Sequence, residues 1–313
     1  MMRFKIGTRG SKLALWQAHW VKEKIEELFA HVNCEIVVIK TKGDQLAAAK
    51  LLEQNGKGFF TKEIEEVLID KRVDAAVHSA KDLPTEIPDD LIVGAIPSRE
   101  INNDVLISKN EKTLQTLPAR AKIGTSSLRR KSQLLRFRKD LEIVDLRGNL
   151  DTRIKKLNTT DLDGIIVAYA GAKRLNFEHL ISETISNEII LPAVGQGAIA
   201  IEIRKNDIDV YRIVEKLNHK ESWFSIMAER SFLRRLRGGC QVPVGAYGYI
   251  DDDVLVLEGM VSTLDGMKVI RKIMRGKAED AEAIGKVLAE EILQEGGDEI
   301  MDEFRGERTN WNG

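Results

Sequence analysis

Cys240, one of only two cysteines in the chain, lies in a stretch suited to covalent chemistry. The surrounding residues, 237–245, read RGGCQVPVG. Glycine permits positive φ and close approach to a ligand, and Pro243 fixes its own φ. A lone cysteine is most often a small buried hydrophobe, but a packed thiol does not need two preceding glycines. We therefore expect Cys240 at an exposed corner, where its thiol can act as a nucleophile or a covalent anchor.

Asp82, in the stretch SAKDLP at 79–84, is the carboxylate with the clearest candidate role in chemistry. This stretch follows a short apolar run, and α/β sheets bind ligands at the carboxyl ends of their strands. The alternative is that Asp82 only forms an Asx turn before a proline. His78 has no second metal-type residue at useful spacing, so we expect a packed histidine and no metal site.

Two stretches of similar sequence each predict a helix N-terminus that can hold an anion. They read IGTRGS at 6–11 and IGTSS at 123–127. The N–H groups of a first helical turn and the helix dipole both favour negative charge. Arg9 would add a planar fork for a carboxylate or phosphate, although a plain strand-to-helix turn with a solvated arginine is equally open.

Further arginines gather near the predicted strand-to-helix corners of the middle of the chain. Arginine recognises planar anions in a bidentate way, so this pattern favours specific carboxylate or phosphate binding over a diffuse positive field. The arginines at these corners are Arg129, Arg130, Arg147 and Arg153. Arg136 and Arg138 could be no more than a solvated face.

The elements that must position these residues alternate between short apolar strands and amphipathic helices. Up to residue 203 the apolar patterns predict strands at 3–6, 35–39, 75–78, 91–96, 105–108, 122–123, 164–167 and 198–203. Helical spacing is clear from Leu13 to Leu28, over 61–70 and over 221–236. After Cys240 the pattern changes to three strands at 246–250, 254–261 and 267–274, with a hairpin at Asp265-Gly266, and a helix over 278–295.

Composition limits the protein class. Of the 313 residues, 43% are hydrophobic and 31% charged, which is typical of a soluble globular protein with two or three domains. Lys and Arg number 48 against 49 Asp and Glu, so the basic excess of a nucleic-acid-binding protein is absent. Two cysteines cannot form a disulfide framework, which favours a reducing, cytoplasmic compartment. No signal-peptide core or membrane-spanning run is visible.

Together these patterns predict three domains. We expect a first α/β lobe from 1–97 with 198–217, a second from 103–192, a small α+β domain from 220–306 and a tail at 307–313. The two lobes would face an anion-binding cleft, to which the third module presents a thiol. The substrate should carry carboxylates or phosphates.

The sequence closely resembles the porphobilinogen deaminase, or hydroxymethylbilane synthase, family. The resemblance spans nearly the whole chain in the family order. Its motifs are TRGS at 8–11, LWQAH at 15–19, GKG at 56–58, HSAKDLP at 78–84, GTSSLRR at 124–130, LRGN at 146–149, LPAVGQG at 191–197 and GGCQVP at 238–243.

The resemblance implies two lobes like those of periplasmic binding proteins plus the small cysteine domain. It also implies a transferase that joins four porphobilinogen molecules into linear hydroxymethylbilane, releasing ammonia, on a dipyrromethane cofactor attached to Cys240. Asp82 matches the catalytic aspartate. The implied cofactor-binding residues are Ser79, Lys81, Thr125, Ser127, Arg129, Arg130, Arg147 and Gly148. The implied substrate-binding residues are Arg9, Ser11, Gln17, Lys57, Arg147, Arg153 and Arg174.

The resemblance further implies a cytoplasmic monomer in haem biosynthesis whose product passes to uroporphyrinogen-III synthase. Two positions depart from the family pattern. Arg237 stands where an acidic residue is expected, and Glu53 stands where some relatives carry a lysine. Glu53 is therefore given no binding role, and Arg237 would change the charge near the thiol.

Two other functions remain open from the residues. The lobes could capture an anionic small molecule without chemistry, although the Cys240 stretch argues against this. Cys240 could alternatively be a redox thiol, but no resolving cysteine lies near it in the sequence.

Overall fold

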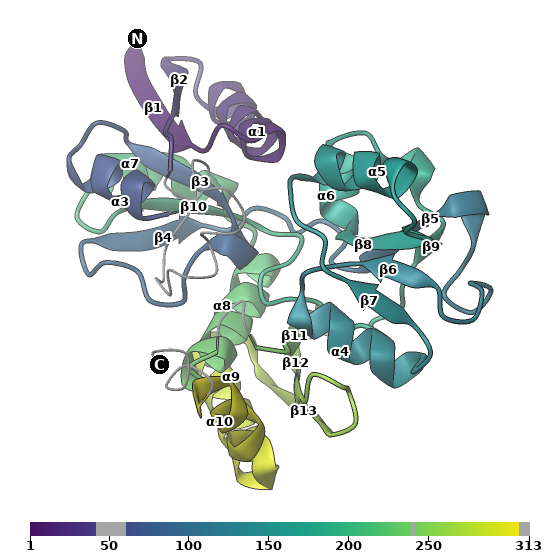
Figure 1. Cartoon of the computed structure of the whole chain (residues 1–313). Coiled ribbons are helices and arrows are strands. Elements are labelled where there is room, and N and C mark those ends of the chain that lie inside the picture. Colours follow the sequence, from purple (N-terminus) through teal and green to yellow (C-terminus); the bar gives the residue numbers. More distant parts are fainter. Residues whose placement is uncertain (42–60, 239–241, 307–313) are drawn as a thin grey trace. The chain divides into compact units, whose positions relative to one another are not determined.

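The chain forms two compact units, which are described separately. The structure, a computed structural model, describes residues 1–41, 61–238 and 242–306 (Figure 1). Unit 1 comprises Met1–Glu100 and Gly197–Trp223, and unit 2 comprises Ile101–Gln196 and Phe224–Gly313. The finer division into three domains stays a prediction.

Unit 1 is a five-stranded mixed sheet in the order β2-β1-β3-β10-β4. β1 is parallel to β2 and β3, whereas β10 is antiparallel to β3 and β4. Both faces are buried: Phe4, Ile6 and Ile25 belong to one core cluster, and Ile64 and Ala76 to another. The elements are β1 (Met2–Thr8), α1 (Lys12–Leu28), β2 (Val32–Val38), α3 (Lys62–Ile69), β3 (Ala75–Ser79), β4 (Leu91–Ala95), β10 (Ile199–Arg204) and α7 (Ile208–Val214).

The sheet of unit 2 repeats this topology in the order β7-β6-β8-β5-β9. β6 is parallel to β7 and β8, and β5 is antiparallel to its two neighbours. The similarity of the Gly-Thr stretches thus reflects two lobes with the same strand order. The elements are β5 (Asp104–Ser108), β6 (Lys122–Gly124), α4 (Leu128–Phe137), β7 (Glu142–Val144), α5 (Leu150–Thr159), β8 (Gly164–Ala168), α6 (Tyr169–Arg174) and β9 (Glu183–Thr184).

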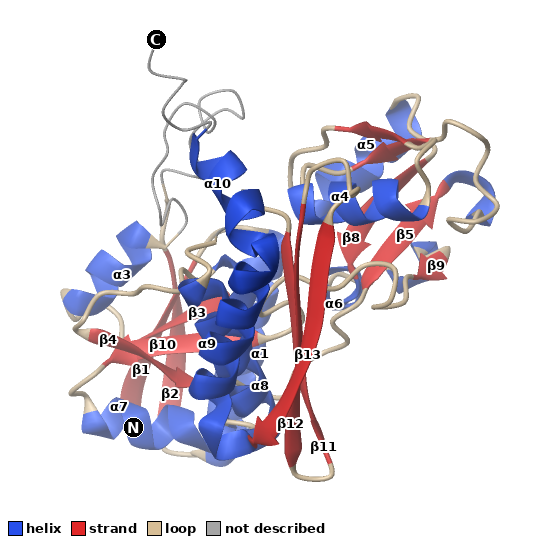
Figure 2. Ribbon diagram, turned by 90° about the horizontal axis from the view of Figure 1, so that it is seen from below, coloured by secondary structure: helices blue, strands red, loops and turns tan. Residues whose placement is uncertain are grey.

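Unit 2 also contains an antiparallel sheet covered by helices, as the sequence predicts. Its strands pair in chain order, and α9 lies along the sheet (Figure 2). Phe232, Leu257 and Leu288 are fully buried in the shared core. The elements are α8 (Lys220–Arg235), β11 (Val244–Asp251), β12 (Val254–Ser262), β13 (Val269–Lys277), α9 (Ala281–Ile292) and α10 (Asp298–Gly306).

Two of the differences from the predicted bounds of this module have a visible physical cause. β13 starts at Val269, not at Met267, because the Asp265 side chain accepts a hydrogen bond from the Met267 N–H and extends the turn. The helix expected over 278–295 corresponds to α9 and an irregular last turn that ends near Gly296, whose φ of +94° is left-handed, and a further helix, α10, then follows.

Gly285 fixes the contact between α8 and α9. A Cβ added there would lie 2.2 Å from the Ala228 carbonyl oxygen and 2.8 Å from the Phe232 nitrogen. Glycine weakens a helix interior by roughly 1 kcal/mol relative to alanine. The close approach of the α8 backbone explains why a helix of this module contains glycine at this position.

We expect Gly285→Ala to destabilise the protein, although it raises helix propensity, because the α8 backbone cannot move aside cheaply. Overpacking of this kind costs about 1–3 kcal/mol of the free energy of unfolding. Val287→Ala, on the exposed side of the same helix, is the control and should change stability within about 0.5 kcal/mol. Urea denaturation measures both variants. A Gly285→Ala protein more stable than the wild type would contradict the close-packing explanation.

Candidate active site

The candidate residues of unit 1 gather at the carboxyl ends of β1 and β3. These strands are parallel neighbours, so the residues that follow them lie at the same edge of the sheet. Gln17, on α1, is tied to this edge: its Nε2 donates to Ser79 Oγ at 2.9 Å, and Ser79 Oγ donates to Gln17 Oε1 at 3.1 Å. The prediction that Gln17 and Ser79 belong to one site is therefore consistent with their direct contact.

Asp82 ends the short 3₁₀ turn Ala80–Asp82 that follows β3. Its side chain is exposed, and among the described residues its carboxylate has no hydrogen-bond or ion-pair partner. An Asx turn requires such a hydrogen bond. The carboxylate is thus available at the strand end instead of being used to close the turn.

Ser11 caps α1. Its hydroxyl accepts a hydrogen bond from the Ala14 N–H at 3.3 Å, and its backbone is extended. Arg9 lies between β1 and this cap and is half-buried. Arg9 and the first turn of α1 therefore lie at the same sheet edge that carries Asp82.

The candidate residues of unit 2 occupy the corresponding edge of the second sheet. Thr125, which is 3% exposed, directly follows β6, and its Oγ1 accepts from the Ser127 N–H at 3.2 Å. Ser127 caps α4 by accepting from the Arg130 N–H at 3.4 Å. This arrangement matches the capped start of α1 in unit 1.

The loop after β7 supplies a second group at that edge. Arg147 Nε lies 3.1 Å from Asp145 Oδ2, in a pair that is partly exposed. Gly148 has a φ of +117°, and its carbonyl accepts from Arg153 Nε at 2.8 Å. Arg174, at the end of α6 beyond β8, is 8% exposed. All these residues follow the parallel strands β6, β7 and β8.

Arg129 and Arg130 are buried around one carboxylate, Asp104. Arg129 Nη1 donates to Asp104 Oδ2 at 2.7 Å, and Arg130 donates to Asp104 Oδ1 through Nε at 2.9 Å and Nη2 at 2.6 Å. Asp104 is fully buried, and the two arginines are 4% and 5% exposed. Asp104 is not among the candidate residues of the sequence, although an acidic residue directly before the predicted strand at 105–108 is an available signal.

The electrostatics of this cluster keep the Asp104 carboxylate charged. Burial alone raises the pKa of the Asp104 carboxyl, but the charges of Arg129 and Arg130 outweigh burial, so its pKa lies well below the usual range. Arg130 Nη1 also donates to the Ile166 carbonyl at 2.9 Å. Arg129 Nε, in contrast, is buried with no partner among the described residues.

Other candidates have more limited descriptions. Cys240 and Lys57 lie outside the described residues. His78 is packed as expected, at 6% exposed, with Nε2 3.2 Å from Glu202 Oε2. Over the described ranges, no group of three or more His, Cys, Asp or Glu side chains is arranged to hold a metal ion.

Cys34 is unsuited to thiol chemistry. It is 3% exposed on β2, and burial, with a smaller effect of the Glu26 carboxylate, raises the pKa of its thiol to about 11. The nucleophilic form of cysteine is the thiolate, so Cys34 is inert near neutral pH. Any thiol chemistry of this chain therefore depends on Cys240.

Comparison with known proteins identifies the family of this chain. Residues 4–212 match the family model described as porphobilinogen deaminase, dipyromethane cofactor binding domain, and residues 223–294 match porphobilinogen deaminase, C-terminal domain. The chain belongs to the porphobilinogen deaminase family. The porphobilinogen deaminase of Pelotomaculum thermopropionicum is 49% identical over 96% of this chain and 97% of its own length. That of Moorella thermoacetica is 47% identical over the whole of both chains.

Family membership confirms several predictions. The chain is a porphobilinogen deaminase-type transferase of tetrapyrrole biosynthesis with a dipyrromethane-binding domain, and capture of an anion without chemistry is not favoured. The predicted fold class, two α/β lobes with a C-terminal α+β module, is also confirmed. A solved substrate binding domain of a putative molybdenum ABC transporter from Clostridium difficile is 10% identical, covers 70% of this chain and 93% of that chain, and has a TM-score of 0.44.

No helix within the described ranges combines the length and the apolar character needed to cross a membrane.

We expect Asp104→Asn to destabilise the deaminase by about 3–5 kcal/mol, because two buried guanidinium groups would lose their counter-charge. Asp140→Asn is the control: Asp140 pairs with Arg138 on the surface at 2.5 Å and should contribute much less. Urea denaturation at pH 7 measures both. The lowered pKa of Asp104 means that its contribution is complete above about pH 4 and is lost as the pH falls further. The difference from wild type should therefore narrow in acid; equal losses for both variants at pH 7 would contradict this assignment.

Proposed function

We propose that Asp82 is the catalytic carboxylate with which this chain joins four porphobilinogen molecules into linear hydroxymethylbilane. The observation that carries the assignment is the exposed Asp82 carboxylate at the end of β3, which has no partner among the described residues. A carboxylate that merely closed a turn would be hydrogen-bonded. Its position at the carboxyl end of a strand is the usual place for ligand chemistry in an α/β sheet.

The two sheet edges would hold the carboxylates of the pyrroles. Each porphobilinogen carries an acetate and a propionate, so the growing chain accumulates negative charge that arginine forks can hold without deprotonating. We assign substrate carboxylates to Arg9, Ser11, Gln17, Lys57, Arg147, Arg153 and Arg174.

The dipyrromethane cofactor has compatible partners among the residues of the second edge. The buried Arg129 Nε has no partner among the described residues, and a cofactor carboxylate would satisfy it. Asp104 would fix Arg129 and Arg130 in position, so these two arginines need not reorganise when an anion arrives. We assign the cofactor to Ser79, Lys81, Thr125, Ser127, Arg129, Arg130, Arg147 and Gly148, with Cys240 as the point of attachment.

Asp82 would act on the charge that develops as ammonia leaves. Departure of ammonia makes the substrate pyrrole cationic, and a fixed carboxylate beside the pyrrole N–H groups stabilises that charge. The same carboxylate can accept and return a proton within the step. When bound through a thioether, the dipyrromethane supplies the pyrrole to which the first unit is joined. Attachment keeps the chain at the site, so Asp82 meets each new unit in an effectively intramolecular reaction.

The setting of the enzyme is also part of the proposal. We expect it to act as a monomer in the cytoplasm and to pass its product to uroporphyrinogen-III synthase. The near-neutral charge and the two cysteines of the sequence support a soluble enzyme in a reducing compartment.

The purified protein should be heavier than its sequence by one dipyrromethane, located on the peptide that contains Cys240. Intact-mass measurement and peptide mapping test this. Cys240→Ser should lack the added mass and be inactive, whereas the matched Cys34→Ser should keep both the added mass and activity, because the Cys34 thiol is buried and protonated. Full activity of Cys240→Ser would exclude covalent attachment, and a free, alkylatable Cys240 in active enzyme would favour the redox alternative.

Asp82→Asn should stay folded and bind porphobilinogen weakly, but turn over at least about a hundredfold more slowly, because one preorganised charge is lost. Asp82→Glu should retain some activity, since the charge survives in a shifted position. Asp89→Asn, an exposed change in the same unit, is the control. The measurement is single-turnover ammonia release from pre-assembled enzyme beside a melting curve. Near-normal release from Asp82→Asn would remove Asp82 from the catalytic role.

A further inference from the structure

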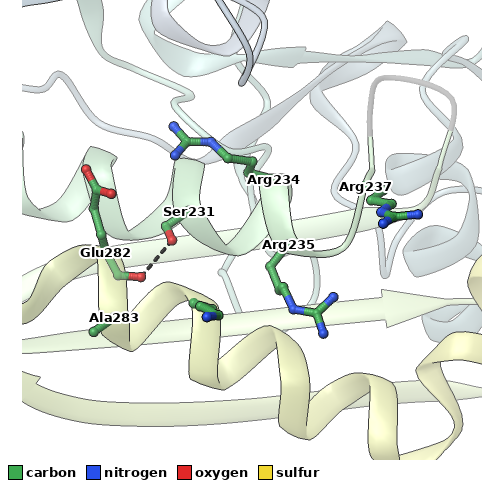
Figure 3. Close-up of a pocket in the computed structure, with 7 residues that line it drawn as sticks. Ser231, Arg234, Arg235, Arg237, Glu282 and Ala283 are labelled. Carbon is green, nitrogen blue, oxygen red and sulfur yellow. Dashed lines mark hydrogen bonds between the residues drawn. The ribbon is translucent and has the colours of Figure 1, made fainter.

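A hollow in the C-terminal module of unit 2 is lined mainly by cations (Figure 3). It has a volume of about 440 Å³, within the range of small-ligand sites. One wall is the end of α8 and the turn that follows it, and the other is α9. The lining residues are Ser231, Arg234, Arg235, Arg237, Glu282, Ala283 and Lys286.

The charges of this hollow do not balance. The hollow is lined by four cationic side chains and by one carboxylate, that of Glu282. Arg235 is offset by Glu290, with its Nε 3.0 Å from Oε1. For Arg234, Arg237 and Lys286, no ion pair is formed with any residue of the described ranges. Like charges repel across such a space, so an anion bound there would lower the electrostatic energy.

The walls of the hollow are held by contacts independent of these charges. Ser231 Oγ, on α8, donates to the Glu282 carbonyl on α9 at 2.6 Å (Figure 3). The close approach at Gly285 fixes the same two helices. The two helices that carry the cations are therefore held at a fixed spacing, and the four cationic side chains project from them as exposed groups.

The backbone of Arg237 gives a separate indication that its side chain serves a binding role. Its φ of +52° is left-handed, at the position after a helix where glycine is preferred. The turn is closed by Gly238 N–H donating to the Leu233 carbonyl at 3.2 Å. Arg234 and Arg235 also lie in the last turn of α8, where cations offset the helix dipole. That explanation does not extend to Lys286, in the middle of α9.

We propose that this hollow binds a small anion carrying two or more carboxylate or phosphate groups. Arg234, Arg237 and Lys286 supply the positive charges. The Ser231 hydrogen bond and the close approach at Gly285 fix the distance between α8 and α9. The site is independent of the catalytic assignment of Asp82, and Arg237 lies only three residues before Cys240 in the sequence. Occupancy would add a counter-charge beside the turn that leads to the cofactor cysteine.

Calorimetric titration of the holoenzyme with citrate and, separately, with pyrophosphate tests this proposal and distinguishes a carboxylate from a phosphate ligand. We expect one equivalent to bind, more weakly as salt is raised. Arg237→Gly and Lys286→Gln should each weaken binding about tenfold, the loss expected for one charge-assisted contact. Arg275→Gln, an exposed charge change on β13 of the same unit, is the matched control and should leave binding unchanged.

Arg237→Gly also separates a binding role from a structural one. Glycine suits the left-handed backbone, so the melting temperature should be unchanged or higher while anion affinity falls. A lowered melting temperature with unchanged affinity would overturn the proposal. So would equal weakening by Arg275→Gln, which indicates diffuse attraction, or absence of binding by both probes. Single-turnover ammonia release, measured on the same variants, reports on Asp82 separately.

Discussion

The arrangement of the second edge depends on one buried charge. Asp104 receives Arg129 and Arg130 in an environment where an unpaired charge would be costly, so the three groups are stable only together. Because the arginines lie in the first turn of α4 and Asp104 begins β5, the cluster joins the helix start to the central sheet. The capped turn at Ser127 is held in place by this cluster.

In both lobes a helix is tied to the sheet near the candidate site, but through different interactions. In unit 1, Gln17 and Ser79 link α1 to the end of β3 through neutral hydrogen bonds, while unit 2 uses ions. Parallel strands bring the loops that follow them to one edge, which is why residues distant in sequence can serve one ligand. Because Gln17 and Ser79 are both uncharged, this link places no cation beside the Asp82 carboxylate.

The C-terminal module depends on close packing of two helices against an antiparallel sheet. Gly285 lets α8 and α9 approach closely, and β11 follows within the same antiparallel sheet. α8 and β11 contribute to one core, in which Phe232 on α8 and Leu257 on β12 are both fully buried. The cation-lined hollow lies on the outer side of the same helix pair.

Much of this protein could be predicted from local sequence. The strand and helix periods, the serine caps at Ser11 and Ser127, and the motifs around Asp82 and Cys240 all depend on neighbouring residues, so they specify fold class and family directly. The bounds of the last helices were less predictable because Gly296 interrupts an otherwise continuous apolar pattern.

The tertiary structure alone decided which polar residues face each other. Asp104 has no distinguishing local motif, and it lies 25 and 26 residues from the arginines with which it pairs. Gly285 lowers the helix propensity of α9, and only the fold shows the reason for it: a Cβ added there would lie 2.2 Å from the α8 backbone. The sequence by itself determined the elements and the chemistry available, because both follow from neighbouring residues. Long-range pairing of buried charges depends on how the chain folds back, which no local pattern records.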